Sequence, residues 1–114
     1  MKQYLFLLRG GKPAASKTEE ESKAENAAWG VYMGGLAQNG NMAGGSPVVG
    51  GGRSVSASGI TNEPVTSSPE GIVGGYLIIN AESLDAAAAI ADACPHKNYG
   101  GHIEVREIAP MPAM

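Results

Sequence analysis

The chain has 114 residues, of which 43% are hydrophobic and 17% are charged, and its formal net charge is −3. This length predicts one domain over residues 1–114 with one modest core. The acidic balance and the absence of a basic run predict no direct binding to nucleic acid. The apolar runs are too short to span a membrane, and the N-terminus lacks a signal-peptide pattern. A single cysteine, Cys94, excludes an intrachain disulfide, which fits a cytoplasmic location.

The first third of the chain predicts a strand followed by a long helix. Lys2 to Arg9 is apolar on both faces, which is typical of a strand covered on both sides. In the predicted helix, Thr18 to Asn39, the first residue and Glu21 have the spacing of a capping box. The helix glycines cost stability, so we expect close packing on the sheet to offset them. The expected apolar stripe is Ala24, Ala28, Val31, Gly35 and Leu36, widened by Trp29, Tyr32 and Met33.

The middle of the chain is rich in glycine. We expect the segment from Asn41 to Gly52 to be a turn-rich loop. Two short strands, Ser54 to Ile60 and Pro64 to Ser67, are expected to follow as a hairpin with its turn at Gly59 to Asn62. The sequence leaves open whether the glycine-rich segment 40–52 closes over a cleft or forms a loose loop.

The last third predicts a strand, a helix and a strand. Ile72 to Asn80 is rich in aliphatic residues, and its Gly74-Gly75 pair indicates a bulge or a close approach of another backbone. A helix from Ser83 to Cys94 is capped by its first residue and ended by Pro95. The final strand, His102 to Ile108, alternates between apolar and polar side chains.

This order predicts an α+β fold in which two right-handed βα units form an antiparallel sheet with both helices on one face. We place Tyr4, Phe6 and Leu8 on the same face as Tyr76 and Ile78, opposite the other apolar set of these strands. The helices can cover one set alone. A large bare apolar patch is rare on a monomer, so we expect a homodimer through the open sheet face.

Several segments, in this order, resemble the DGPF-type branch of the YCII-related proteins. They are Ile72-Val-Gly-Gly-Tyr-Leu-Ile-Ile, Glu82-Ser-Leu-Asp-Ala-Ala, Ala93-Cys-Pro and Gly100-Gly-His-Ile-Glu-Val-Arg-Glu. The opening strand and the helix with Trp29 also fit. The resemblance implies a ferredoxin-like βαβ-βαβ fold that pairs as a dimeric α/β barrel, here with an extra β-hairpin in the middle. The DGPF signature itself is degenerate, because the nearest stretch is Asn62-Glu-Pro-Val.

The resemblance also bears on catalysis. Some members of the wider family carry a His in the first helix and an Asp at the end of the second, a proposed acid/base pair. By position these fall near Trp29 and Cys94 here, and neither residue moves a proton as a His–Asp pair does at neutral pH. The resemblance further implies an association with sigma factors, because genes for such proteins tend to lie beside those for alternative sigma factors.

The final strand carries the first candidate site. His102, Glu104 and Arg106 share one face, with successive side chains about 7 Å apart along the strand. Arg106 could hold an anionic ligand, and His102 or Glu104 could act as a catalytic acid or base. The plainer alternatives are a solvated strand face or an interface ion pair between Glu104 and Arg106.

Other candidates have equally plain alternatives. Arg9 could join Arg106 in an anion site or be a solvated charge at a strand end. Tyr76 could offer its phenol to a ligand or pack in the core or interface. His96 could be an acid/base group or a loop histidine beside the helix end. Cys94 is expected to be a buried thiol without a catalytic role.

The residues support two hypotheses for function. The first is a homodimer that binds a small acidic ligand or a protein without catalysing a reaction. The second is an enzyme, a lyase or isomerase, acting on a small carboxylated compound in the dimer cleft. Neither needs a cofactor, because the glycine pairs and the Gly50-Gly51-Gly52 run match no nucleotide-binding pattern. One cysteine and two histidines at no standard spacing predict no metal site.

Overall fold

The computed structural model describes residues 1–65 and 70–110. The elements are β1 (Lys2–Gly10), η1 (Ala14–Ser16), α1 (Glu19–Gln38), β2 (Met42–Pro47), β3 (Ser54–Ser56), β4 (Gly59–Thr61), β5 (Val73–Ala81), α2 (Leu84–Asp92), η2 (Pro95–Tyr99) and β6 (Gly101–Glu107). The η elements are short 3-10 helices. No helix in residues 1–65 and 70–110 is long and apolar enough to cross a membrane.

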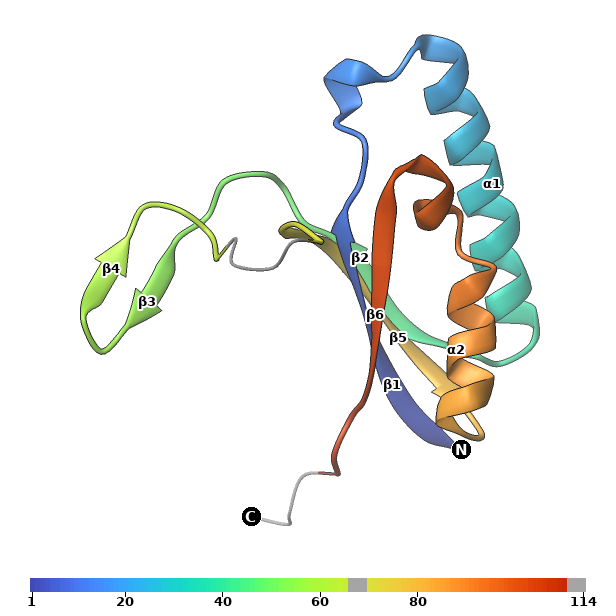
Figure 1. The fold of residues 1–114 in the computed structure, drawn as a ribbon. Coiled ribbons are helices and arrows are strands. Elements are labelled where there is room, and N and C mark those ends of the chain that lie inside the picture. The colour runs from blue at the N-terminus through green and yellow to red at the C-terminus, as the bar shows by residue number, and fades with distance from the viewer. Residues whose placement is uncertain (66–69, 111–114) are drawn as a thin grey trace.

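The main sheet has four strands in the order β2-β5-β1-β6, and each neighbouring pair is antiparallel. Both α-helices lie on one face of this sheet (Figure 1). The strand order and the helix placement define an α+β, ferredoxin-like fold. The predicted fold class is therefore confirmed.

The core lies between the helices and the covered face of the sheet. On that face Tyr4 is opposite Ile79 and Phe6 is opposite Leu77, and the core also includes Leu36, Ala81, Ala87 and Ala91. The prediction that Tyr4 and Phe6 share a face with Tyr76 was wrong, because Tyr76 is opposite Leu7 on the other face. Consecutive apolar residues in β1 leave the phase of alternation undefined by sequence.

Helix α1 begins as predicted. Thr18 is its N-cap, and the reciprocal hydrogen bonds with Glu21 complete the capping box. The predicted buried stripe was partly wrong: Leu36 is buried, but Val31 is 78% exposed. The helix glycines do not bring α1 closer to the sheet, because a Cβ atom at Gly30 or Gly34 would meet no atom within 4 Å. Trp29, Tyr32 and Met33 instead pack against the core.

The edge strand β2 was not predicted, since it lies inside the glycine-rich segment expected to be a loop. Its sequence, Met-Ala-Gly-Gly-Ser-Pro, has almost no strand propensity. The glycines permit close contact with β5: a Cβ atom at Gly45 would lie 2.6 Å from the carbonyl oxygen of Tyr76, and Gly45 has a φ of +148°. Tertiary pairing, not local preference, makes this segment a strand.

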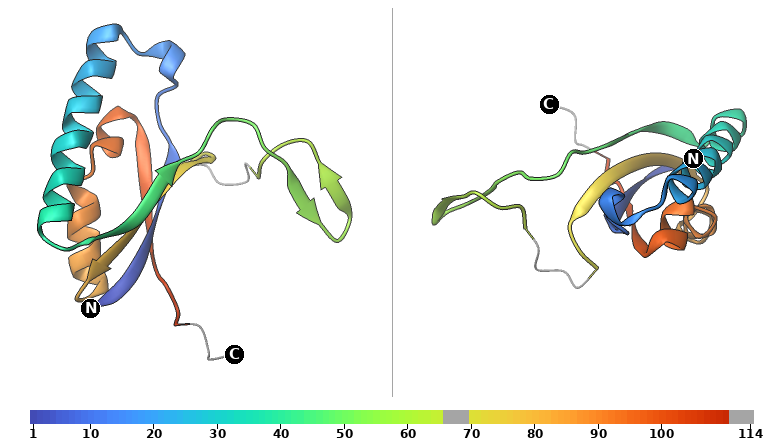
Figure 2. Two further views of the ribbon diagram at one scale, coloured as in Figure 1. Left: turned by 180° about the vertical axis from the view of Figure 1, so that it is seen from behind. Right: turned by 90° about the horizontal axis from the view of Figure 1, so that it is seen from above.

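A hairpin does follow, but its register differs from the prediction. Strands β3 and β4 pair over Ser54–Ser56 and Gly59–Thr61, so the turn falls at residues 57–58 instead of 59–62. Of the predicted second arm, Thr66 and Ser67 lie outside the described residues. We call residues 48–65 the arm. It projects from the sheet on the side opposite the helices, as three views agree (Figures 1 and 2).

The glycine pair in β5 behaves as predicted. The register shifts so that Leu8 is opposite Gly75 and Arg9 is opposite Val73, which makes Gly74 the extra residue of a bulge. A Cβ atom at Gly75 would lie 3.2 Å from the backbone of Pro47. The pair therefore serves both the bulge and the close approach of β2.

The last helix is shorter than predicted. Ser83 caps it as expected, but it ends at Asp92, and Pro95 opens η2. Cys94, which lies between α2 and η2 in the sequence, is fully buried, as predicted.

The helix glycines and the strand glycine predict opposite effects of the same substitution. Gly34→Ala should raise the free energy of unfolding by about 1 kcal/mol, because alanine favours the helix and its Cβ has room. Gly45→Ala should lower it by about 1–3 kcal/mol, because the Cβ meets the β5 backbone. Urea titration measures both values, and a stabilised Gly45→Ala variant would contradict the close approach of β2 and β5.

Candidate functional site

The face of the sheet away from the helices carries most of the candidate residues. Across β1 and β6, Arg9 is opposite His102, Leu7 is opposite Glu104 and Leu5 is opposite Arg106. Across β1 and β5, Leu5 is opposite Ile78 and Leu7 is opposite Tyr76. A polar strip along β6 therefore lies beside an apolar strip on β1 and β5. We call this side the open face.

The polar strip contains a chain of ion pairs that joins β1 to β6. Arg9 Nε donates to Glu104 Oε1 at 2.8 Å, and Arg106 Nη1 donates to Glu104 Oε2 at 3.2 Å. Arg9 Nη1 also donates to the carbonyl oxygen of Gly71 at 3.3 Å. These hydrogen bonds, from Arg9 first and Arg106 second, lower the pKa of Glu104. Two guanidinium groups thus share one carboxylate. We call Arg9, Glu104 and Arg106 the trio, and it carries a net positive charge.

The trio combines two interpretations that the sequence had left separate. The predicted ion pair between Glu104 and Arg106 is present within one chain, and Arg9 joins Arg106 through the same carboxylate. His102 is exposed on the same strip, opposite Arg9. Tyr76 lies on the same face but across β1 from this strip, as the strand order β5-β1-β6 requires.

His96 lies apart from the trio, on the backbone side of Arg9. Its Nε2 is 2.8 Å from the carbonyl oxygen of Arg9, and its ring is half-buried. The ring sits against two glycines: a Cβ atom at Gly101 would lie 2.2 Å from Nε2, and one at Gly11 would lie 2.8 Å from Cε1. His96 therefore docks η2 onto the end of β1 and supports the backbone that carries the Arg9 guanidinium.

Arg9 also lines a cavity of about 710 Å³ between the end of the sheet and the base of the arm. The apolar lining comes from Pro13, from the arm residues Val48, Val49, Pro64 and Val65, and from Ile72 and Val73 at the start of β5. The remaining lining residues are glycines. Arg9 is thus the charged side chain of an otherwise apolar and glycine-lined hollow.

The sequence reasoning missed the arm residues that line this cavity. Their signal was weak: an adjacent valine pair, Val48 and Val49, between a proline and a glycine run, and a Pro64-Val65 pair sixteen residues further on. Neither pair has the periodicity of an element, and only the tertiary structure places both pairs on the wall of one cavity.

A second, smaller cavity of about 340 Å³ lies between α1 and the β2 and β5 strands. Trp29 and Met33 line it from the helix, and Leu77, Pro47 and Tyr76 line it from the sheet. Trp29 packs edge-on against Tyr32, with 5.8 Å between ring centroids. Trp29 therefore forms an aromatic wall of this cavity.

The partly buried Tyr32 and the fully buried Cys94 are neighbours behind that wall. The Tyr32 hydroxyl donates to the carbonyl oxygen of Ile90 at 2.8 Å. Burial raises the pKa of the Tyr32 hydroxyl and also the pKa of the Cys94 thiol, so both groups stay protonated at neutral pH. A protonated, buried thiol is a poor nucleophile.

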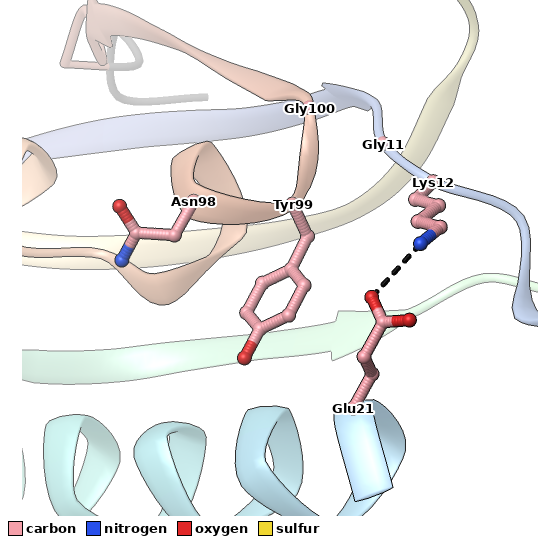
Figure 3. A pocket seen from close by; sticks show the side chains of 6 residues that line it. All are labelled: Gly11, Lys12, Glu21, Asn98, Tyr99 and Gly100. Carbon is pink, nitrogen blue, oxygen red and sulfur yellow. Dashed lines mark hydrogen bonds and ion pairs between the residues drawn. The ribbon is translucent and has the colours of Figure 1, made fainter. Parts of the chain in front are cut away.

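A third hollow, of about 560 Å³, lies between η2 and the start of α1 (Figure 3). Here Lys12 Nζ pairs with Glu21 Oε2 at 2.8 Å, and the Tyr99 ring points toward α1. The neighbouring Lys17 pairs with Glu25 and lies 5.5 Å from the Tyr99 ring centroid. No sequence pattern indicated the Lys17–Glu25 pair, because Lys17 precedes the helix. The carboxylates neutralise the lysines, while the Lys17 contact with the Tyr99 ring and the 2.7 Å hydrogen bond from Lys12 N–H to the Tyr99 carbonyl oxygen attach η2 to the segment before α1.

Metal ligation has little support in this arrangement. In the part of the chain that the structure describes, no group of three or more His, Cys, Asp or Glu residues could hold a metal ion. The carboxylate of Glu104 is engaged by two arginines.

The fold and the sheet-face site define a small ferredoxin-like α+β protein with an arginine-lined cavity. A family model, the YCII-related domain, matches residues 3–112. The chain therefore belongs to the YCII-related domain family. No curated protein is significantly similar to it.

One similar solved structure is 5-chloro-2-hydroxyhydroquinone dehydrochlorinase (TftG) from Burkholderia phenoliruptrix AC1100, in complex with 2,5-dihydroxybenzoquinone. The TM-score is 0.57 with 19% identity, and the match covers 94% of this chain and 93% of that one. At this level of identity the likeness establishes the fold alone.

The contact between His96 and Gly101 predicts a strong coupling between two substitutions. Gly101→Ala should cost about 1–3 kcal/mol of unfolding free energy, because its Cβ overlaps the imidazole ring. In a His96→Ala background most of that cost should disappear. A double-mutant cycle by denaturant unfolding measures the coupling, and additive effects would contradict the docking of the ring.

The Glu104 ion pairs predict a pH-dependent contribution to stability. The pKa of folded Glu104 is below its ordinary value of 4.5, so its stabilisation is present above that pH and is lost as the pH falls through the lowered pKa. The melting temperature of wild type should exceed that of Glu104→Gln at about pH 7, and the difference should shrink toward about pH 3. A difference independent of pH would show that the charge of Glu104 does not stabilise the fold.

Proposed function

We propose that this protein is a homodimer that binds a small carboxylated compound in the cavity beside Arg9. The observation that carries the proposal is a partly buried arginine, Arg9, that lines a cavity of about 710 Å³ whose other lining residues are apolar or glycine. Ligand sites typically combine apolar walls with a few polar groups that fix orientation. Within this cavity Arg9 would be that group.

A carboxylate is the ligand group that best suits Arg9. A guanidinium has five N–H donors arranged for planar, two-point recognition of carboxylates. Two of the Arg9 nitrogen atoms have the hydrogen bonds to Glu104 and Gly71 described above, so donor capacity remains for a ligand. Glu104 holds the side chain in place, and Arg106 keeps the local charge positive. A preorganised arginine costs less entropy on binding than a free one.

The rest of the ligand would be apolar and compact. Valine, isoleucine and proline side chains line the cavity around Arg9. The open face beside it carries Leu5, Leu7, Tyr76 and Ile78 without cover from either α-helix. Such a surface favours packing of a second copy face to face, which would bring two cavities into one dimer.

Catalysis by this site is a second candidate. His102 lies opposite Arg9 on the open face, where its imidazole could act as a general acid or base on a bound ligand. The solved relative is a dehydrochlorinase, so the fold accommodates an enzyme. We favour binding without catalysis, because the resemblance implies that the acid/base pair proposed for other family members falls near Trp29 and Cys94 here.

The DGPF-type assignment and the link to sigma factors are further proposals that rest on the sequence motifs. An acidic protein of this kind would act on a sigma factor through protein contact or through its ligand. That role would make ligand binding a signal and not a step of metabolism.

The proposal is tested by a thermal-shift screen of small aromatic and aliphatic carboxylates. We expect a subset to raise the melting temperature of wild type, and Arg9→Gln to weaken their affinity about 10- to 100-fold, as for loss of a charged hydrogen bond. Arg106→Ala should weaken it less, because Arg106 acts through the shared carboxylate. Arg53→Gln, which alters an exposed arginine that does not line the cavity, is the matched control.

A compound that binds should then be incubated with the protein and followed by NMR. An unchanged ligand supports the binding hypothesis, whereas conversion that His102→Gln abolishes supports the enzyme. If no carboxylate stabilises the wild type, or if Arg9→Gln binds as well as wild type, the proposed site is wrong.

A further inference from the structure

The contacts within this chain do not account for the conformation of the arm, residues 48–65. Its strands β3 and β4 form a separate two-stranded sheet of three residues each. Val55 is opposite Ile60, so the two side chains share one face of the hairpin, and they are 76% and 68% exposed. Arg53 and Glu63 are the charged residues of segment 48–65. The arm thus presents an apolar, weakly charged tip to solvent.

A hairpin this short is not expected to hold its shape alone. Isolated two-stranded hairpins are at best marginally stable in water. The neck of this one is tied by Ser54 Oγ, which donates to the carbonyl oxygen of Glu63 at 2.6 Å, but the strands of the tip do not pair with the main sheet. A partner surface that buries Val55 and Ile60 would supply the missing stabilisation.

The surface area of the whole chain points to the same conclusion. Its solvent-accessible surface is 7614 Å². A compact monomer of 11.6 kDa is expected to expose about 5,800 Å². The excess of about 1,800 Å² exceeds the share of about 800 Å² that one partner contributes to a standard interface. The arm and the open face both contribute exposed surface that an interface could bury.

The direction in which the arm projects favours a second copy of this chain as the partner. It leaves the sheet on the side opposite the helices, which is the side of the open face (Figures 1 and 2). A second copy packed on the apolar strip of that face would lie alongside the arm. Because a two-fold interface repeats every contact, each chain would then both offer an arm and receive one.

We propose that the arm clasps a second copy of this chain, with Val55 and Ile60 packed against the partner subunit. This inference rests on the homodimer of the proposed function and adds a role for residues 48–65. The base of the arm lines the Arg9 cavity through Val48, Val49, Pro64 and Val65. A clasped arm would therefore hold the cavity wall in place, so that the ligand site is complete only in the dimer.

The first test is the dimer dissociation constant, measured by analytical ultracentrifugation. The double substitution Val55→Asp with Ile60→Asp should raise this constant roughly tenfold or more, because it places charge on buried interface positions. Val31→Asp is the matched control, since Val31 is an equally exposed valine on α1, and it should leave the constant unchanged. Circular dichroism should show that both variants retain the fold.

The second test locates the arm directly. A spin label is attached to Ser58→Cys, at the hairpin turn, in protein without isotope labels. This protein is then mixed with isotope-labelled wild type. The native Cys94 is buried and should not react with the spin label. We expect the label to broaden amide signals of the other chain. Amide signals of the isotope-labelled chain that stay sharp, or a double variant that dimerises as wild type does, overturn the clasp and leave the dimer standing. A wild type that is monomeric at all concentrations overturns both.

Discussion

The structure depends on one geometric constraint: two helices cover one face of a four-stranded sheet whose central strands are apolar on both faces. On the covered face, Phe6 and Leu77 face each other in the core and are fully or almost fully buried. On the open face, Leu7 and Tyr76 stand opposite each other with no helix above them. Every functional inference concerns what lies on, or beside, that second face.

The charged residues of the open face form ion pairs around Glu104. Glu104 sits between two arginines, which keeps it ionised and fixes the orientation of Arg9. Charge-assisted hydrogen bonds of this type are stronger than neutral ones, so the trio positions a cation as well as joining β1 to β6. Meanwhile His96 supports the same residue from the backbone side. Arg9 is thus a well-fastened charged side chain beside a cavity.

The aromatic side chains of the helix layer and the arginine site lie on opposite sides of the sheet. Trp29 packs on Tyr32, and Tyr32 in turn neighbours Cys94 and bonds the end of α2. Aromatic packing thus fills this part of the helix layer. The charged groups lie instead on the open face, around Arg9.

The sequence by itself determined the elements with strong local signals. The capping box at Thr18, the Ser83 cap, the aliphatic strand β5 with its glycine bulge, and the antiparallel sheet with helices on one face all followed from residue pattern. Conformational preference and hydrophobic periodicity act over a few residues, so they are visible in sequence. The alternation in β6 likewise placed Glu104 and Arg106 together.

Tertiary structure alone decided the rest. β2 is a strand because β5 offers a free edge, and no local preference of Gly44 or Gly45 indicates it. The phase of β1 was set by packing, since Leu5 to Leu8 are all apolar. Arg9 and Glu104 are 95 residues apart, and their ion pair exists because β1 and β6 are neighbours in the sheet. Contacts between distant segments depend on the strand order, which a single sequence specifies through the summed packing of the core and not through any short motif.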